Sequence, residues 1–373
     1  MSDCGKVLLV GSIARPDDGW SVEDVFRRSA AELGGYVSMF PDGELGDRSL
    51  WIAWLPRKVY SRHPDVRTTS RHTYDDWRPR GYDDHWKVTV REGVDALAFP
   101  EVGYAAEAKA SFEIFRRLRD EGVIPAGSRF LVTLPLTESA VRAFVDTARD
   151  YELLWEAYND AIRREIAEIV DAIPHAELAI QWDMARETAA VEGIEFNFAN
   201  SELTRVSSDP MERYAEALGQ VACEIPDGVW VGLHVCYGAL GHEEGESPDT
   251  AHYVPIRDLG TAVEMLNRGV RSAGRRVDYV HMPVQLSEKH DAFYAPLDRL
   301  DVGDAHVYLG LVDPWDGLEG ALDRITLARR HLADFGVATP CGWGRRPASQ
   351  TPDSLLRLNR AVAERLEEPT PVG

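Results

Sequence analysis

Three residues in the C-terminal half of the chain are of the types that bind transition metals. His234 and Cys236 lie two residues apart in "GLHVCYGALGH", at the end of an apolar run, and Cys341 follows in "ATPCGWGRR". In a β-strand, residues i and i+2 point to the same side, so His234 and Cys236 can face one ion. Imidazole and thiolate are ligands that zinc prefers, and Gly342 would let the backbone approach the metal closely. The alternative is a hydrogen-bonded core histidine with two thiols that act as small buried residues.

Short β-branched runs alternate with polar amphipathic stretches along the chain. The runs predicted as strands are "KVLLVGS" (6–12), "YVSMF" (36–40), "ALAFPEV" (96–102), "RFLVTLPL" (129–136), "ELAIQWD" (177–183), "VWVGLHVCYG" (229–238), "VDYVHMP" (277–283), "HVYLGLVD" (306–313) and "GVATPCG" (336–342). Several are almost continuously apolar, as parallel strands covered on both faces are. The alternation predicts an α/β fold, a (β/α)8 TIM barrel in which the run 96–102 is accessory. A doubly wound open sheet is the alternative.

One segment does not follow this alternation of strand-like and helix-like stretches. Residues 51–93 are rich in Trp, Arg, Asp and His, and the chain of 373 residues is longer than a barrel needs. We predict an insertion after the second strand, at about 51–93, that covers the barrel mouth. No internal repeat and no long Pro/Gly linker divides the chain, so we expect a single domain over 1–373.

Charge and cysteine content narrow the class of protein. With 62 acidic and 41 basic residues the formal net charge is −21, which disfavours binding to nucleic acid or to anionic membranes. The sequence contains no apolar run of transmembrane length and no signal peptide, so we expect a cytoplasmic protein. Four scattered cysteines fit a reducing compartment rather than a disulfide framework. The expected partners are small molecules, and a homo-oligomer is compatible with the sequence.

Polar residues at the C-terminal ends of predicted strands are the strongest candidates for active-site residues, because barrel active sites form there. Asp183 and Glu187 lie at a strand end and one helical turn beyond it in "QWDMARE", so both can point into the mouth. Helix capping is the alternative role for Asp183. Glu44, in "PDGELGDR", could bind a polar head group or act as a general acid or base, and turn formation is its alternative.

Arginines and a tryptophan complete the candidate substrate-binding residues. Arg15, Arg48 and Arg345 could bind a carboxylate or a sulfonate, because guanidinium offers paired donors. For each of them a surface salt bridge is the competing explanation. Trp315, near a predicted loop end, could form one wall of an apolar pocket or pack into the core.

Ordered motifs along the chain resemble the C-terminal catalytic barrel of cobalamin-independent methionine synthase. They are "GSIARP", "GELGDR", "VTLPLT", "QWD", "HVCYG" and "TPCGWGRR", spread over roughly residues 9–346. The resemblance implies the uroporphyrinogen decarboxylase/methionine synthase-like superfamily of TIM barrels, whose zinc members activate a thiol for alkylation. Epoxyalkane:coenzyme M transferase is a related member. The resemblance also implies that Asp183 contacts the polar head of the substrate, for example an amine.

The chain departs from the family pattern in three places. The family has a fourth zinc ligand, a glutamate, where this chain has His281, which could bind zinc or act as an acid or base. Trp315 stands where the family has a proton-handling histidine. We also expect no counterpart of the N-terminal barrel that helps methionine synthase hold folate, so ordinary methionine synthesis is not the expected reaction.

These observations together predict a zinc enzyme that transfers an alkyl group, most simply methyl, between an alkyl donor and a small-molecule thiol. Zinc would be held by His234, Cys236 and Cys341, with Asp183, Glu44 and His281 as catalytic residues and Arg15, Arg48, Glu187, Trp315 and Arg345 as substrate-binding residues. The alternatives are an epoxide:thiol transferase of the coenzyme M type, a metal-free decarboxylase or lyase of the uroporphyrinogen decarboxylase type, and a non-catalytic binding protein.

Overall fold

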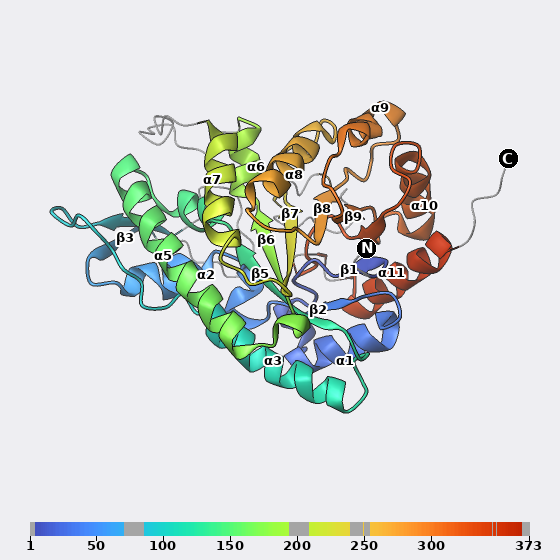
Figure 1. The fold of residues 1–373 in the computed structure, drawn as a ribbon, viewed down its shortest axis with the longest axis horizontal. Helices are drawn as coiled ribbons and strands as arrows, with labels where there is room; N and C mark the ends of the chain where they lie inside the picture. Colours follow the sequence, from blue (N-terminus) through green and yellow to red (C-terminus); the bar gives the residue numbers. More distant parts are fainter. Residues whose placement is uncertain are drawn as a thin grey trace.

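Eight parallel strands form one sheet that curves into a barrel (Figure 1). The computed structural model describes residues 4–70, 86–193, 209–238, 249, 254–344, 346–347 and 349–367. The barrel strands are β1 (Val7–Leu8), β2 (Met39–Pro41), β5 (Arg129–Pro135), β6 (Leu178–Met184), β7 (Trp230–Val235), β8 (Tyr279–Pro283), β9 (His306–Gly310) and β10 (Gly336–Ala338). They lie in the order β1-β10-β9-β8-β7-β6-β5-β2. This arrangement confirms the predicted (β/α)8 barrel.

The barrel closes between its first two strands without a regular ladder. The backbone N–H groups of Lys6 and Val7, at the start of β1, both donate to the Tyr36 carbonyl, at 2.7 and 3.0 Å. Tyr36 comes shortly before β2, so these two bonds join the edges of the sheet. The hydrogen bonds that close the barrel therefore lie at the N-terminal ends of the strands, opposite the end where function is expected.

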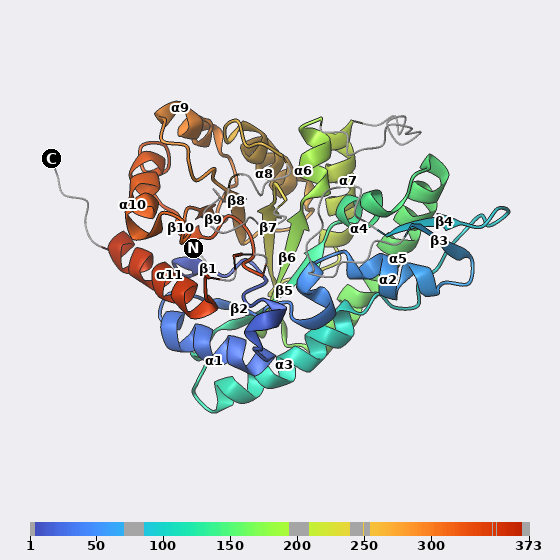
Figure 2. The same ribbon diagram turned by 180° about the vertical axis from the view of Figure 1, so that it is seen from behind.

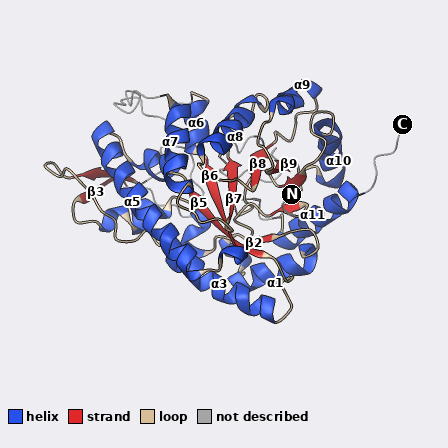
Figure 3. Cartoon of the chain, viewed as in Figure 1, coloured by secondary structure: helices blue, strands red, loops and turns tan. Residues whose placement is uncertain are grey.

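Helices surround the barrel on its outer side (Figures 2 and 3). They are α1 (Val22–Leu33), α2 (Trp54–Lys58), α3 (Tyr104–Asp120), α4 (Thr137–Val141), α5 (Ala148–Ala172), α6 (Arg186–Val191), α7 (Pro210–Ala222), α8 (Gly260–Ser272), α9 (Asp291–Tyr294), α10 (Gly317–Ala328) and α11 (Pro352–Glu367). Local sequence explains their starts: Ser21 and Asp24 form a capping box at α1. None of the helices in the described part of the chain has the length and apolar character needed to cross a membrane.

Two tyrosines fill the interior of the barrel near the N-terminal ends of its strands. Tyr279 and Tyr308 belong to a buried cluster of side chains mostly from the barrel strands, against which the partly buried Trp230 of β7 also packs. On β7 a Cβ atom at Gly232 would lie 2.0 Å from the Tyr279 ring, and one at Gly336 would lie 2.5 Å from the Tyr308 ring. Glycine is therefore required at both positions. The two tyrosine side chains fill the barrel interior on the N-terminal side of the polar residues at the mouth.

The predicted insertion after the second strand is present. Its described part contains α2 and an antiparallel pair, β3 (Val66–Ser70) and β4 (Lys87–Val90), which lies at the margin of the molecule beside α5 (Figure 1). Asp150 of α5 accepts hydrogen bonds from the Thr89 hydroxyl at 2.8 Å and from Val90 N at 3.2 Å. Residues 71–85 are outside the described residues, and coverage of the mouth by this insertion stays a prediction.

The strand predicted at 96–102 is wrong. This segment has no strand partner and forms no regular secondary structure. Side chains of α5 satisfy its backbone: Arg164 donates to the Phe99 carbonyl at 2.6 Å, and Glu165 accepts from the N–H groups of Val102 and Gly103 at 2.6 and 2.9 Å. The apolar run buries Phe99 and Val102 against the core, which produced a strand-like pattern without a strand.

Candidate active site

Asp183, His234 and His281 form a row across three neighbouring strands. In the parallel register Asp183 of β6 pairs with His234 of β7, and His234 pairs with His281 of β8. Residues paired in this way point to the same side of a sheet. All three side chains are buried, with exposed fractions of 7%, 1% and 0%. The barrel thus carries a buried row of titratable groups near the C-terminal ends of adjacent strands, where TIM-barrel active sites lie.

His234 and the two late cysteines bring their donor atoms together. One ligand atom from each of His234, Cys236 and Cys341 lies within 4.8 Å of the others. The Sγ atoms of Cys236 and Cys341 are 3.6 Å apart. Two thiolates on one tetrahedral zinc ion stand roughly 3.8 Å apart, because each Zn–S bond is about 2.3 Å. The donor types and their separation therefore fit zinc.

The local environment disfavours the charged forms of Cys236 and His281 when no cation is bound. The hydrogen bond with Cys341, followed by burial, raises the pKa of the Cys236 thiol well above its usual range. Burial, and then the neighbouring His234, lower the pKa of His281 well below its usual range. A metal cation would reverse the situation of the thiols, because it stabilises thiolate. The N–H of Gly238, 3.3 Å from Cys236 Sγ, would also stabilise a thiolate there.

Asp183 and Glu44 place two buried carboxyl groups beside this cluster. Burial raises the pKa of Asp183 well above its usual range, and the nearby Glu44 raises it further. Glu44 accepts a hydrogen bond from the Thr133 hydroxyl, and its backbone adopts φ 51°, a region in which non-glycine residues are uncommon. The Asp42 carboxylate accepts from Glu44 N at 3.0 Å and so supports this turn. The surrounding structure therefore holds both carboxyl groups in place.

Sequence reasoning missed the residue that orients Asp183. The Gln181 side-chain amide donates to Asp183 Oδ1 at 2.8 Å and to the Val10 carbonyl at 2.7 Å, while its oxygen accepts from the Tyr279 hydroxyl at 3.1 Å. Every polar atom of this amide is therefore assigned a partner. The signal was present in "QWD", because Gln181 and Asp183 are two residues apart on one strand and must face the same side.

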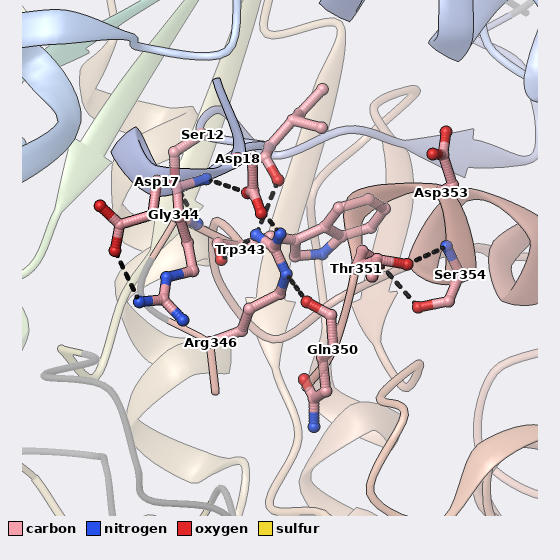
Figure 4. A network of polar contacts seen from close by, with 12 residues as sticks. Ser12, Asp17, Asp18, Trp343, Gly344, Arg346, Gln350, Thr351, Asp353 and Ser354 are labelled. Atoms are coloured by element: carbon pink, nitrogen blue, oxygen red, sulfur yellow. Dashed lines mark hydrogen bonds and ion pairs between the residues drawn. The ribbon is translucent and has the colours of Figure 1, made fainter. Parts of the chain in front are cut away.

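The loop that carries Cys341 rests on the loop after β1. Trp343 N donates to the Ser12 carbonyl at 2.8 Å, and Gly344 N donates to the Ser12 hydroxyl at 3.1 Å (Figure 4). A Cβ atom at Gly342 would lie 2.4 Å from the Ser12 hydroxyl oxygen. The loop that carries Cys341 thus packs against the "GSIARP" segment.

Arg346 links the same two loops through hydrogen bonds from its guanidinium group. Its guanidinium contacts Asp18 at 2.6 Å and the carbonyls of Ile13, Trp343 and Gln350 at 3.1, 3.0 and 2.5 Å (Figure 4). Arg346 is only 5% exposed. Sequence reasoning chose its neighbour Arg345, which lies outside the described residues.

Two predicted substrate-binding arginines have acidic partners of their own. Arg48 donates to Asp42 at 2.7 Å, and the same carboxylate oxygen accepts from the Ser111 hydroxyl at 2.8 Å. Arg15 lies 3.3 Å from Asp17, whose side chain is almost fully exposed. The structure thus places both arginines in ion pairs: the partner of Arg15 is an exposed carboxylate, whereas the pair of Arg48 with Asp42 is largely buried.

Glu187 and Trp315 are not among the residues whose donor atoms meet at the metal cluster. Glu187 is buried and accepts from Ser139 N at 3.0 Å and from the Ser139 hydroxyl at 2.6 Å, and burial is the main cause that raises its pKa to about 7. Trp315 has an exposed fraction of 43% in the loop after β9. The structure does not enclose the Trp315 ring in a pocket of described residues.

Solved structures of methyl-transfer proteins share this fold. A B12-independent methionine synthase from Shewanella sp. W3-18-1, in complex with selenomethionine, has a TM-score of 0.59 at 15% identity, over 97% of each chain. A putative vitamin-B12-independent methionine synthase from Listeria monocytogenes has a TM-score of 0.54 at 14% identity, over 96% of this chain and 97% of that one. A methyltransferase from Methanosarcina mazei has a TM-score of 0.51 at 12% identity, over 96% and 94%.

The sequence itself matches no family model and no curated protein. At identities of 12–15% the likeness establishes the fold. The chain therefore has the fold of the methionine synthase-like catalytic barrel, as its ordered motifs implied.

Proposed function

We propose that this protein is a zinc enzyme that transfers a methyl group between a methyl donor and the sulfur of a small-molecule thiol. The observation that carries the proposal is the convergence of His234, Cys236 and Cys341 within 4.8 Å at the C-terminal end of the barrel. The fold shared with methionine synthases and a methyltransferase supports the same reaction class. The fold alone would not carry it, because one barrel hosts many chemistries.

The ligand set suits thiol activation. Two thiolates and one neutral imidazole would balance the 2+ charge of zinc, so the substrate sulfur can still bind. Bound zinc would lower the pKa of that thiol and hold it as a reactive thiolate at neutral pH. Cys236 directly follows a barrel strand, and the loop that carries Cys341 is hydrogen-bonded to Ser12. The two thiols are therefore held in position before any ligand binds.

The buried carboxyl pair indicates which thiol would bind. Burial and the nearby Glu44 both disfavour ionisation of Asp183, and an ammonium group beside Asp183 would relieve that cost. Arg15 and Arg48 already have acidic partners. The site therefore favours a thiol that carries an ammonium group over one that carries a sulfonate, and this argues against the coenzyme M-type alternative.

The transfer step balances without an oxidant. The substrate thiol loses its proton to solvent when its sulfur binds. The thiolate then attacks the methyl carbon in line, forming the S–C bond as the bond between methyl and donor breaks, and the donor leaves with the electron pair. Asp183 and Glu44 would hold the amine so that the sulfur faces the donor.

The test combines metal analysis with zinc-edge X-ray absorption. We expect purified protein to contain one zinc ion per chain, and we expect homocysteine or cysteine to add a Zn–S bond more readily than coenzyme M. Asp183→Asn should weaken the response to the aminothiols and leave the response to coenzyme M unchanged. Methyltetrahydrofolate and methylcobalamin can serve as trial donors, with the methyl thioether detected by mass spectrometry. A folded, zinc-loaded sample that responds to no thiol would overturn the proposal.

A further inference from the structure

We propose that His281 is a positioning residue that holds His234 by a hydrogen bond and does not itself bind the metal. The inference rests on the proposed zinc site and deepens it. Its basis is one contact: the Nδ1 atoms of His234 and His281 lie 2.6 Å apart. The two rings are tilted by 39° with their centroids 4.7 Å apart.

The separation of the two nitrogens distinguishes a shared hydrogen from a shared metal. Two nitrogen ligands on one tetrahedral zinc ion stand roughly 3.3 Å apart, because each Zn–N bond is about 2.0–2.1 Å. A separation of 2.6 Å is too short for two ligands of one zinc ion, and at this distance the two nitrogens must share a hydrogen. The two sulfur atoms, at 3.6 Å, do have the spacing of two zinc ligands. His281 is also absent from the group whose ligand atoms lie within 4.8 Å of one another.

The contact determines which nitrogen of His234 is available. One of the two Nδ1 atoms must carry the hydrogen and the other must accept it. If His234 donates from Nδ1, its Nε2 lone pair is free for zinc, which is the usual arrangement of a metal-binding histidine and its acceptor. His281 would then carry its hydrogen on Nε2, a buried atom, and the Thr339 backbone also contributes a hydrogen bond to His281. Metal binding thus requires one tautomer of the pair.

Backbone pairing keeps this partner in place. His234 and His281 are register partners in adjacent parallel strands, and both side chains are buried at 1% exposure or less. His281 therefore cannot move toward the sulfur atoms without breaking its contact with His234. Zinc would retain three protein ligands, and the fourth position would remain open for the substrate sulfur, as in catalytic zinc sites.

The direct test is zinc-edge X-ray absorption on wild-type protein without thiol. We expect two sulfur ligands and one imidazole ligand from the protein. A fit that requires two imidazoles would overturn the inference. This measurement needs no variant, so it does not depend on whether a variant folds.

Two substitutions test the hydrogen bond itself. Asn at position 281 can place a polar atom near the Nδ1 position, whereas Leu cannot. We expect both His281→Asn and His281→Leu to retain one zinc per chain. Transfer of zinc to a chelator should be about 10–100-fold faster in His281→Leu and near the wild-type rate in His281→Asn. Circular dichroism of the metal-free variants controls for folding.

The outcomes separate this inference from the proposed function. If wild-type protein binds no zinc, the proposed function is wrong. If wild-type protein binds zinc but folded His281→Leu releases it at the wild-type rate, only the positioning role is wrong. If both folded variants lose zinc as completely as His234→Leu, His281 is a ligand and the inference is overturned.

Discussion

The sulfur atoms of Cys236 and Cys341 lie 3.6 Å apart although the residues are 105 positions apart in the chain. They do not come from neighbouring strands, because β8 and β9 lie between β7 and β10 in the barrel. The loop after β10 must therefore reach inward across the mouth to bring Cys341 to Cys236. A contact of this kind, between two polarisable sulfur atoms beside a histidine, is the arrangement expected of a metal site.

The first prediction concerns zinc content. Cys236→Ser and Cys341→Ser should each reduce bound zinc from one equivalent to a small fraction, because a serine hydroxyl is a poor substitute for thiolate. Cys223→Ser is the matched control, since Cys223 is exposed on the surface. The measurement is elemental analysis after dialysis. Full zinc retention in either site variant would show that the cluster does not bind zinc.

The repeating pattern of the sequence was sufficient to predict the barrel. Almost continuously apolar runs identified the eight barrel strands, because parallel strands are buried on both faces. The same rule failed at 96–102, where Phe99 and Val102 are buried in the core while hydrogen bonds with side chains of α5 replace a strand partner. The i, i+2 spacing placed His234 and Cys236 on one side of β7, and it would also have identified Gln181 beside Asp183.

Contacts distant in sequence could not be predicted in this way. The pairing of Arg346 with Asp18 joins residues 328 positions apart, and no local pattern distinguishes Arg346 from its neighbour. The short contact between His234 and His281 depends on strand register, which the spacing of two separate runs does not determine. The fold class was therefore accessible from periodicity, whereas the partner of each polar side chain required the structure.

The second prediction concerns Gly342. A Cβ atom there would lie 2.4 Å from the Ser12 hydroxyl oxygen and 3.1 Å from Ser12 N, so Gly342→Ala should displace the loop that carries Cys341. We expect zinc transfer to a chelator to become at least about tenfold faster, since even small displacements of a ligand disturb its geometry. Gly35→Ala is the control, because a Cβ at Gly35 meets nothing within 4 Å. Equal release rates for both variants would contradict the packing argument.

The third prediction concerns the buried Arg346. Arg346→Ala removes the guanidinium that donates to Asp18 and to three backbone carbonyls, so we expect a loss of about 2–4 kcal/mol in the free energy of unfolding. Arg360→Ala on α11, an arginine with an exposed pair to Glu364, should cost at most about 0.5 kcal/mol. Denaturant unfolding of both metal-free variants makes the comparison. A similar loss in the two variants would show that Arg346 does not fasten the loops.

The fourth prediction concerns the dependence of stability on pH. Burial, the largest cause, raises the pKa of Glu187 from its ordinary value of 4.5 to about 7 in the folded protein. Between these values the unfolded chain has lost the proton and the folded chain keeps it. Stability contributed by this group is therefore highest at low pH and decreases as pH rises from about 4.5 to 7. The full effect is at most about 3 kcal/mol, from the linkage of pKa and stability.

Glu187→Gln removes this dependence because an amide does not titrate. The substitution disturbs the two hydrogen bonds with Ser139, so the informative quantity is the change with pH in the difference between wild-type and variant melting temperatures. We expect the melting temperature of the variant, relative to that of the wild type, to rise by several degrees between pH 5 and pH 8. Glu156→Gln on α5, an exposed position, should show no such gain. A difference that stays constant across this range would mean that Glu187 is already ionised in the folded protein at pH 5, with the Ser139 donors and the start of α6 stabilising its charge.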